Sequence, residues 1–265
     1  MPKVFIGVGH GGSDFGASSG GLIEKNLALV TALACKDVLV SNGIRVKMSR
    51  VIDENDTISQ EVQECNQYHP NLAVEIHYNA GGGDGLEIYR YRGGGESLKA
   101  SQKIETRMVQ AGQNSRGIKV KLNNSGTDYY MWIRETKAPA VLIEVGFLDN
   151  TTDRQLFDTE EEQRKLGQVI GYGILDYFNI SFKVATTNQT STVSTEKIYK
   201  VQVGAFKNIT NAEKLKNELN TKGYSSFITN VNELYKVQVG AFRNKSNAQK
   251  LVNELKSKGY NSFIS

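Results

Sequence analysis

An internal repeat near the C-terminus strongly limits what the last part of this chain can fold into. Residues 198–229 and 234–265 align at an offset of 36 and are identical at 22 of 32 positions. Each copy reads as a strand with alternating apolar residues, a helix, a Lys-Gly-Tyr stop and a second short strand. One such unit cannot bury a core alone, but two together can. The β-α-β-β-α-β order predicts a small ferredoxin-like sandwich over residues 197–265.

The first 180 residues alternate strand-like and helix-like segments. Strands are expected at 3–10, 44–49, 71–78, 86–91 and 140–145, and helices at 24–40, 57–68, 96–112 and 160–178. This alternation predicts an α/β domain over residues 1–180, with a largely parallel central sheet flanked by helices. In such folds the functional crevice lies beyond the carboxyl ends of the strands. Residues 181–196, rich in Ser, Thr and Asn, are typical of a flexible linker.

The net charge of +4 hides an asymmetry along the chain. Residues 1–180 hold 19 Lys/Arg and 23 Asp/Glu, a balance of −4, whereas residues 181–265 hold 13 and 5, a balance of +8. A basic C-terminal part indicates contact with an anionic surface. Nucleic acid, a wall that carries teichoic acid and a membrane surface all satisfy this charge.

The N-terminal apolar stretch is too short and too interrupted for a signal peptide, and no later segment is long enough to span a bilayer. We therefore expect synthesis in the cytoplasm without an export signal, and no transmembrane segment. Cys35 and Cys65 lie far apart in helical patterns without a metal-binding spacing. We interpret both as buried free thiols.

Three polar residues interrupt the apolar strands. His10 ends the first strand, His77 lies near the end of another, and Glu144 interrupts a third. Glu24 opens the first helix, and the glycine-rich loop before it can return it to the same edge. Two imidazoles and a carboxylate form the ligand set of a catalytic zinc ion with one position left for water, and another acid would serve as general base. A structural role for each strand-end histidine is the alternative. His69 is expected on the surface.

Four segments resemble the zinc-dependent N-acetylmuramoyl-L-alanine amidases of the amidase-3 family: GHGGSDFGA at 9–17, GLIEK at 21–25, EIHYNA at 75–80 and PAVLIEVGFLDN at 139–150. The resemblance implies that His10, Glu24 and His77 bind one Zn²⁺ and that Glu144 is the catalytic acid/base. It further implies hydrolysis of the amide between N-acetylmuramic acid and L-alanine in peptidoglycan. Asn79 is predicted to contact substrate. We expect a monomer.

Two positions depart from that family's pattern. Gly7 and Val8 stand where the family commonly has Asp-Pro, and Glu61 stands where it tends to carry an arginine. Neither position is a metal ligand by the resemblance. We therefore expect altered local packing or substrate preference at these sites, with activity retained.

The C-terminal repeats resemble the SPOR domain through their Tyr-Lys-Val-Gln-Val-Gly-Ala-Phe and Lys-Gly-Tyr segments. The resemblance implies binding to glycan strands stripped of stem peptides. If Val201 and Val203 face the helices, four residues are expected on the open sheet face, where amides and aromatic rings suit sugars. They are Gln202, Phe206, Gln238 and Phe242. The alternative is that the phenylalanines fill the edge of the core.

Three functional hypotheses remain. The leading one is a peptidoglycan amidase held on the wall by its C-terminal repeats, which acts after the membrane is opened. As its setting we favour a phage or prophage endolysin over an amidase that lyses the mother cell of a spore-forming bacterium. A nucleic-acid-binding protein would explain the basic repeats but not the His/Glu set. An inactive wall-binding protein would not need that set either.

Overall fold

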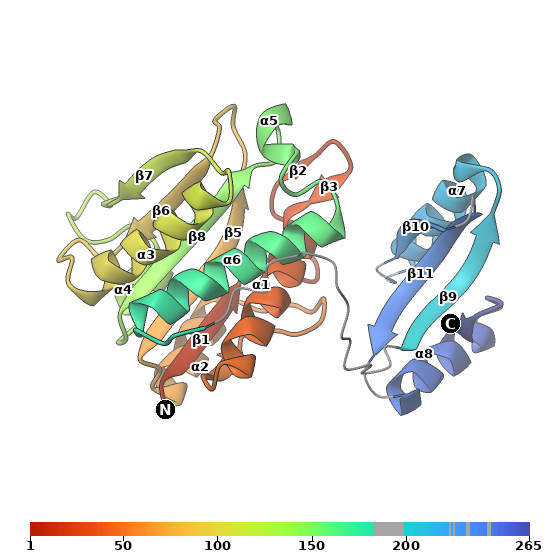
Figure 1. The fold of residues 1–265 in the computed structure, drawn as a ribbon, viewed down its shortest axis with the longest axis horizontal. Coiled ribbons are helices and arrows are strands. Elements are labelled where there is room, and N and C mark those ends of the chain that lie inside the picture. Colours follow the sequence, from red (N-terminus) through yellow and green to blue (C-terminus); the bar gives the residue numbers. More distant parts are fainter. Residues whose placement is uncertain (183–198, 223, 225, 232–233, 243–244) are drawn as a thin grey trace. The chain divides into compact units, whose positions relative to one another are not determined.

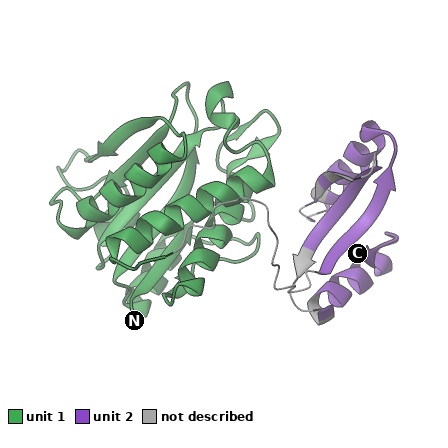
Figure 2. Cartoon of the chain, viewed as in Figure 1, with its two compact units in different colours: residues 1–185 green, residues 186–265 purple. Residues whose placement is uncertain are grey.

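In a computed structural model the chain forms two compact units, residues 1–185 and 186–265 (Figure 2). The structure describes residues 1–182, 199–222, 224, 226–231, 234–242 and 245–265. The expected linker, residues 181–196, lies almost wholly outside these ranges. None of the described helices combines the length and the apolar character needed to cross a membrane.

The first unit is built on a six-stranded sheet in the order β4-β1-β5-β8-β6-β7 (Figure 1). The strands β1, β4, β5 and β8 run parallel, β6 is antiparallel to β8, and β7 is parallel to β6. Their bounds are Lys3–Val8 (β1), Arg45–Met48 (β4), Leu72–Asn79 (β5), Leu86–Arg90 (β6), Ser115–Lys119 (β7) and Ala140–Phe147 (β8). The prediction of a largely parallel central sheet is confirmed.

Helices cover both faces of this sheet. The helices α1 (Glu24–Ser41), α3 (Glu96–Gln110) and α6 (Glu160–Tyr177) pack on one face, and α2 (Ile58–Tyr68) and α4 (Met131–Glu135) pack on the other. The alternation of β1 shows the division: Val4 and Ile6 belong to the larger core, whereas Phe5 packs with Trp132 in the smaller one. Strands buried on both faces explain the continuous apolar runs in the sequence.

Local signals set several helix ends. Thr57 and Thr159 each form a capping box, with Gln60 and Glu162 respectively. The elements that the sequence did not predict are a two-stranded hairpin, β2 (Ser18–Ser19) with β3 (Leu22–Ile23), and the short β7, α4 and α5 (Thr151–Arg154). Segments this short contain too few residues for a hydrophobic period to be recognised.

Both cysteines and the third histidine behave as predicted. Cys35 and Cys65 are fully buried free thiols within the core of the first unit. His69 is exposed and ends α2 in the left-handed conformation.

The second unit has the predicted β-α-β-β-α-β order, with the four-stranded antiparallel sheet β10-β11-β9-β12. Its elements are β9 (Tyr199–Phe206), α7 (Ile209–Thr221), β10 (Phe227–Val231), β11 (Leu234–Phe242), α8 (Lys245–Ser257) and β12 (Phe263–Ile264). The repeats meet symmetrically. Tyr224 donates to Glu254 at 2.6 Å, and the equivalent Tyr260 donates to Glu218 at 2.9 Å. Each repeat thus satisfies a carboxylate of the other, as expected of units that fold as a pair.

The predicted outward position of Phe206 is wrong. Gln202 pairs with Gln238 across β9 and β11, and the register shifts on either side of this pair. The bulge at Val203 reverses the alternation of β9, so that Phe206 lies opposite Tyr235 and packs against the core. The alternative prediction, that this phenylalanine fills the edge of the core, is confirmed.

The two glutamines are also less accessible than predicted. Each is 4 % exposed, and Gln238 Oε1 is buried without a hydrogen-bond partner among the described residues. Little of either amide is therefore accessible in this structure, and the predicted contact of the two glutamines with glycan stays a prediction. The side chain of Phe242 lies outside the described part of the chain.

Candidate active site

Four elements bring the predicted site residues together at one edge of the sheet. His10 follows β1 in a left-handed conformation with φ 60°, and Glu24 is the first residue of α1. His77 on β5 and Glu144 on β8 are partners in the parallel register. Neighbouring residues in register project to the same face, so this pairing places the carboxyl group beside the imidazole. All four predicted residues lie in one site.

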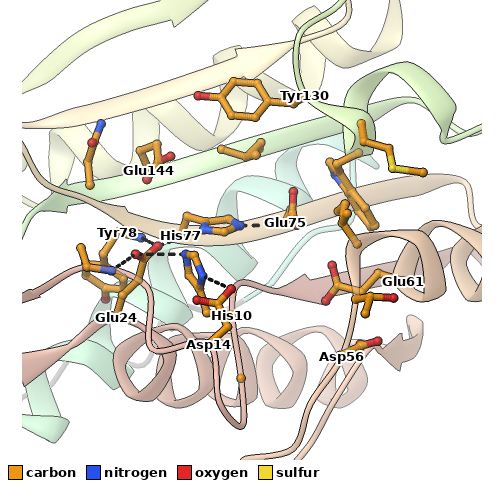
Figure 3. A pocket seen from close by; sticks show the side chains of 18 of the residues that line it. His10, Asp14, Glu24, Asp56, Glu61, Glu75, His77, Tyr78, Tyr130 and Glu144 are labelled. Atoms are coloured by element: carbon orange, nitrogen blue, oxygen red, sulfur yellow. Dashed lines mark hydrogen bonds and ion pairs between the residues drawn. The ribbon is translucent and has the colours of Figure 1, made fainter.

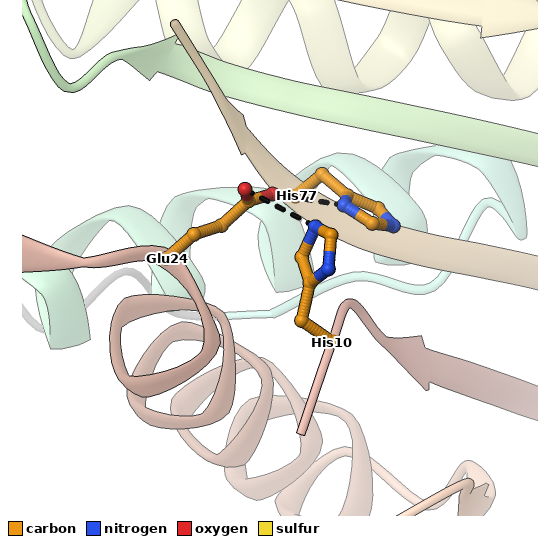
Figure 4. A group of neighbouring side chains, drawn as sticks. All are labelled: His10, Glu24 and His77. Carbon is orange, nitrogen blue, oxygen red and sulfur yellow. Dashed lines mark hydrogen bonds and ion pairs between the residues drawn. The ribbon is translucent and has the colours of Figure 1, made fainter. Parts of the chain in front are cut away.

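Glu24 lies between the two histidines (Figure 4). Its Oε1 is 2.9 Å from His77 Nδ1, and its Oε2 is 3.1 Å from His10 Nε2. One ligand atom from each of the three residues lies within 4.8 Å of the others. Backbone N–H groups of Tyr78 and Ala17 donate to the same carboxylate at 3.0 and 2.8 Å. These bonds hold the carboxylate in one orientation.

Glycine is needed where the two histidines approach each other. A Cβ at Gly9 would lie only 2.5 to 2.7 Å from three ring atoms of His77. The same applies to Gly16, whose Cβ would lie 2.5 Å from both Glu24 Oε2 and His10 Cδ2. These glycines of the first motif therefore create the space in which the two rings and the carboxylate meet.

The electrostatics of this group favour an ionised carboxylate. Burial alone would raise the pKa of Glu24, but hydrogen bonds with His10 and His77 lower this pKa below its usual range. Burial would likewise lower the pKa of His77, yet hydrogen bonds with Glu24 and Glu75 raise it well above its ordinary value. The site thus concentrates negative charge around two imidazoles, which is the environment that a divalent cation requires.

Glu144 differs from Glu24 in its environment. Its Oε2 is buried and has no hydrogen-bond partner among the described residues. Burial first, and the carboxylates of Glu24, Glu75 and Glu87 next, raise the pKa of Glu144 to about 7, although His77 opposes the rise. A carboxyl group with a pKa near neutrality can both take and release a proton.

These residues line a cavity of about 720 Å³ (Figure 3). Tyr130, Met131 and Trp132 close it on the side of α4, and Asp56 and Glu61 line it on the side of α2. Its size suits a segment of peptide or sugar rather than a single ion.

A charged network adjoins Glu144 on β6. Glu87 is the register partner of Glu144 and is buried. Arg116 Nε and Lys119 Nζ each donate to its Oε1 at 2.6 Å, and Tyr89 donates to its Oε2 at 2.8 Å. Burial would raise the pKa of Glu87, but these hydrogen bonds lower it. Glu87 is therefore an ionised carboxylate beside Glu144 whose charge is balanced by Arg116 and Lys119.

Asn79 belongs to the cavity wall, as expected of a substrate contact. Its Nδ2 is 3.4 Å from Glu87 Oε2, and its Oδ1 accepts from the backbone N–H of Ala80 at 2.8 Å. Its predicted contact with substrate stays a prediction.

Sequence reasoning assigned no role to two carboxylates that touch the histidines. Asp14 Oδ2 lies 2.8 Å from His10 Nδ1, and Glu75 Oε1 lies 3.4 Å from His77 Nε2. Each histidine thus has a second carboxylate on the ring nitrogen that faces away from Glu24. The position of Glu75, two residues before His77 on a strand, was the available signal, because such residues share a face.

The two departures from the family pattern meet in this site. Gly7 is the register partner of Glu75, and a Cβ at this glycine would lie 3.1 Å from Glu75 Cγ. Glu61, which is 5 % exposed, has its pKa raised to about 8 by burial and then by the Glu75 carboxylate. The expected effect of these two positions on local packing or substrate preference stays a prediction.

The residues present fit a zinc ion. Two imidazole nitrogens and a carboxylate, each within reach of one point, match the donor set of a catalytic zinc site. Carboxylates on the outer ring nitrogens are the usual partners of metal-binding histidines. Glu144, whose Oε2 has no hydrogen-bond partner among the described residues, lies in the same site but is not one of these three ligands.

Comparison with known proteins agrees with this geometry. Residues 4–176 match the Amidase_3 family, described as N-acetylmuramoyl-L-alanine amidase, and residues 195–265 match the SPOR domain. The catalytic domain of CwlV, an N-acetylmuramoyl-L-alanine amidase from Bacillus (Paenibacillus) polymyxa, superposes with a TM-score of 0.61 at 31 % identity, over 68 % of this chain and 100 % of that one.

Curated relatives extend the similarity across both units. N-acetylmuramoyl-L-alanine amidase CwlM of Bacillus licheniformis is 35 % identical over 86 % of this chain and 85 % of its own length. The sporulation-specific N-acetylmuramoyl-L-alanine amidase of Bacillus subtilis is 34 % identical over 86 % and 84 %. The endolysin of Bacillus phage SPP1 is 29 % identical over 68 % and 67 %. The chain therefore belongs to the N-acetylmuramoyl-L-alanine amidase family and carries a C-terminal SPOR domain.

Proposed function

We propose that this protein hydrolyses the amide between the lactyl group of N-acetylmuramic acid and L-alanine in peptidoglycan, with one Zn²⁺ held by His10, Glu24 and His77. The observation that carries the proposal is the position of Glu144. This carboxyl group has a buried oxygen without a hydrogen-bond partner in the described part of the chain. It lies beside a set of residues that can bind zinc, in a cavity large enough for substrate.

Zinc in such a site polarises a carbonyl group and lowers the pKa of water. The residues of the chain supply the remaining chemistry. Glu144 Oε2 takes a proton from the attacking water and returns it to the amide nitrogen as that nitrogen leaves. The raised pKa of Glu144 suits both transfers, because neither protonation state is strongly disfavoured near pH 7. Tyr130 and Trp132 supply aromatic surface to this part of the cavity wall.

The C-terminal unit is proposed to hold the enzyme on glycan strands. Its charge balance of +8 over residues 181–265 suits an anionic wall. Gln202 and Gln238 lie side by side in the middle of its sheet, and Phe263 is exposed on the edge strand beside Gln202. The exposed ring of Phe263 provides an apolar face for a sugar, whereas the two buried glutamines would have to become accessible before they could bond to one. In this proposal residues 1–180 act as the catalytic domain and 197–265 as the wall-binding domain.

A digest of purified peptidoglycan tests the enzyme activity. New N-terminal alanine that disappears on chelation and returns with zinc is the expected result. New reducing sugar ends, or no release, would contradict the amidase assignment. Sedimentation with insoluble wall, compared with a gel shift on single-stranded RNA, tests the C-terminal unit. Retention by RNA alone would favour a nucleic-acid partner.

The biological setting is a separate proposal. The sporulation-specific relative matches 86 % of the chain, whereas the SPP1 endolysin matches 68 %. This coverage supports a lytic role in spore formation over the endolysin role favoured from the sequence. Deletion of the gene should leave mother-cell walls intact after sporulation. Normal release of spores, together with failure of phage-induced lysis, would support the endolysin role instead.

A further inference from the structure

The two ring nitrogens of His77 face two different carboxylates. Nδ1 lies 2.9 Å from Glu24 Oε1, on the side where the metal ligands converge. Nε2 lies 3.4 Å from Glu75 Oε1, on the opposite side of the ring (Figure 3). A neutral imidazole carries one proton, and it can bind a metal only through the nitrogen without it. The carboxylate that accepts the other N–H therefore decides which nitrogen is free.

The environment confines Glu75 to this position. Glu75 is 3 % exposed and lies on β5 on the same face as His77. A Cβ at Gly7 on the neighbouring strand would lie 3.1 Å from Glu75 Cγ and 3.3 Å from Trp132 Cη2. Trp132 is held in turn by a 3.0 Å hydrogen bond from its Nε1 to the carbonyl of Val141. A methyl group at position 7 would therefore press on the Glu75 side chain, which would have to shift by a few tenths of an ångström.

We propose that Glu75 is a positioning residue for the metal centre: it accepts the Nε2–H of His77 and thereby directs Nδ1 to the metal, and Gly7 makes this possible. The inference rests on the proposed function for the presence of zinc, but not for the reaction catalysed. A side chain at position 7 would crowd Glu75, and an acidic one would also place a second negative charge beside it.

Loss of such a partner usually weakens metal binding by about 10- to 100-fold. Zinc affinity of the full-length protein, measured by competition with a chromophoric chelator, is the direct readout. We expect Glu75→Ala to weaken zinc binding by this amount. Glu75→Gln keeps a carbonyl oxygen of the same shape and should weaken it less. Glu64→Gln, a change of a half-exposed carboxylate on α2 that does not line the cavity, is the matched control and should leave the affinity within about 2-fold.

Gly7→Ala distinguishes a positioning role of Glu75 from a purely structural one. Its methyl group should displace Glu75 and weaken zinc binding in the wild-type background. In the Glu75→Ala background the same change should have no further effect on zinc affinity, although it still crowds Trp132. Additive effects of the two changes would overturn the proposal. Circular dichroism of each variant establishes that it is folded, and Glu75→Gln provides the comparison if an alanine variant is not.

A spectroscopic measurement separates this proposal from the amidase assignment. In zinc-loaded protein labelled with ¹⁵N-histidine, His77 should be protonated at Nε2. Protonation at Nδ1, or equal zinc affinity across the Glu75 variants, would refute the role of Glu75. Stoichiometric zinc with the expected variant pattern but without release of N-terminal alanine would refute the proposed reaction and leave the positioning role intact.

Discussion

The free energy of unfolding of Glu61→Gln, measured relative to wild type, should increase as the pH rises. Burial, followed by the Glu75 carboxylate, raises the pKa of Glu61 to about 8 from an ordinary value of 4.5. Below pH 4.5 this carboxyl group is protonated in both the folded and the unfolded chain. Between pH 4.5 and about 8 the unfolded chain loses the proton while the folded chain keeps it, so the free energy of unfolding falls as the pH rises.

The size of the effect follows from the shift. One pKa unit corresponds to about 1.4 kcal/mol, so the full shift corresponds to a loss of at most about 5 kcal/mol above pH 8. Between pH 5.5 and 7.5 the expected change is about 2 to 3 kcal/mol. Glutamine cannot ionise, and the difference between variant and wild type should therefore grow by this amount over that range.

Urea unfolding of the metal-free protein, with chelator present, measures this difference. Trp132 is the single tryptophan of the chain and is fully buried in the same unit, so its fluorescence reports unfolding of that unit. Glu64→Gln, which removes a half-exposed carboxylate from the same helix, is the matched control. If the difference between Glu61→Gln and wild type stayed constant from pH 5.5 to 7.5, the reasoning about Glu61 would be wrong.

Three further predictions concern activity and the second unit. Glu144→Gln should lower the turnover number by more than about 1000-fold with zinc still bound, whereas His77→Ala should lose both zinc and activity. Metal analysis and the alanine-release assay measure these two effects. Near-normal turnover in Glu144→Gln would exclude the proposed role of Glu144. Removal of residues 183–265 should preserve cleavage of small soluble muropeptides but abolish sedimentation with insoluble wall. If the shortened protein were unfolded, the prediction that the two units fold independently would be wrong. Phe206→Ala should destabilise the second unit by about 2 kcal/mol, measured by thermal unfolding of that unit; an unchanged midpoint would mean that this ring does not pack in the core.

The sequence alone determined much of the fold and the principal site residues. Periodicities and the 36-residue repeat were sufficient for the α/β unit and the β-α-β-β-α-β unit, because each pattern permits few ways to bury its apolar face. His10, His77 and Glu144 were recognisable because burial of a polar side chain in a strand costs free energy unless that side chain has a bonding partner. Parallel strands then imply that such residues meet at one edge of the sheet.

Only the tertiary structure decided which neighbours these residues have. Nothing in the sequence shows that Gly7, Glu75 and Trp132 lie together, because strand register and the position of α4 bring them into contact. The raised pKa values of Glu61 and Glu144 follow from burial in that arrangement. In the repeats, the bulge at Val203 turned Phe206 toward the core. A period-2 pattern predicts the face of a residue only while the register is unbroken, and a single extra residue in one strand reverses it.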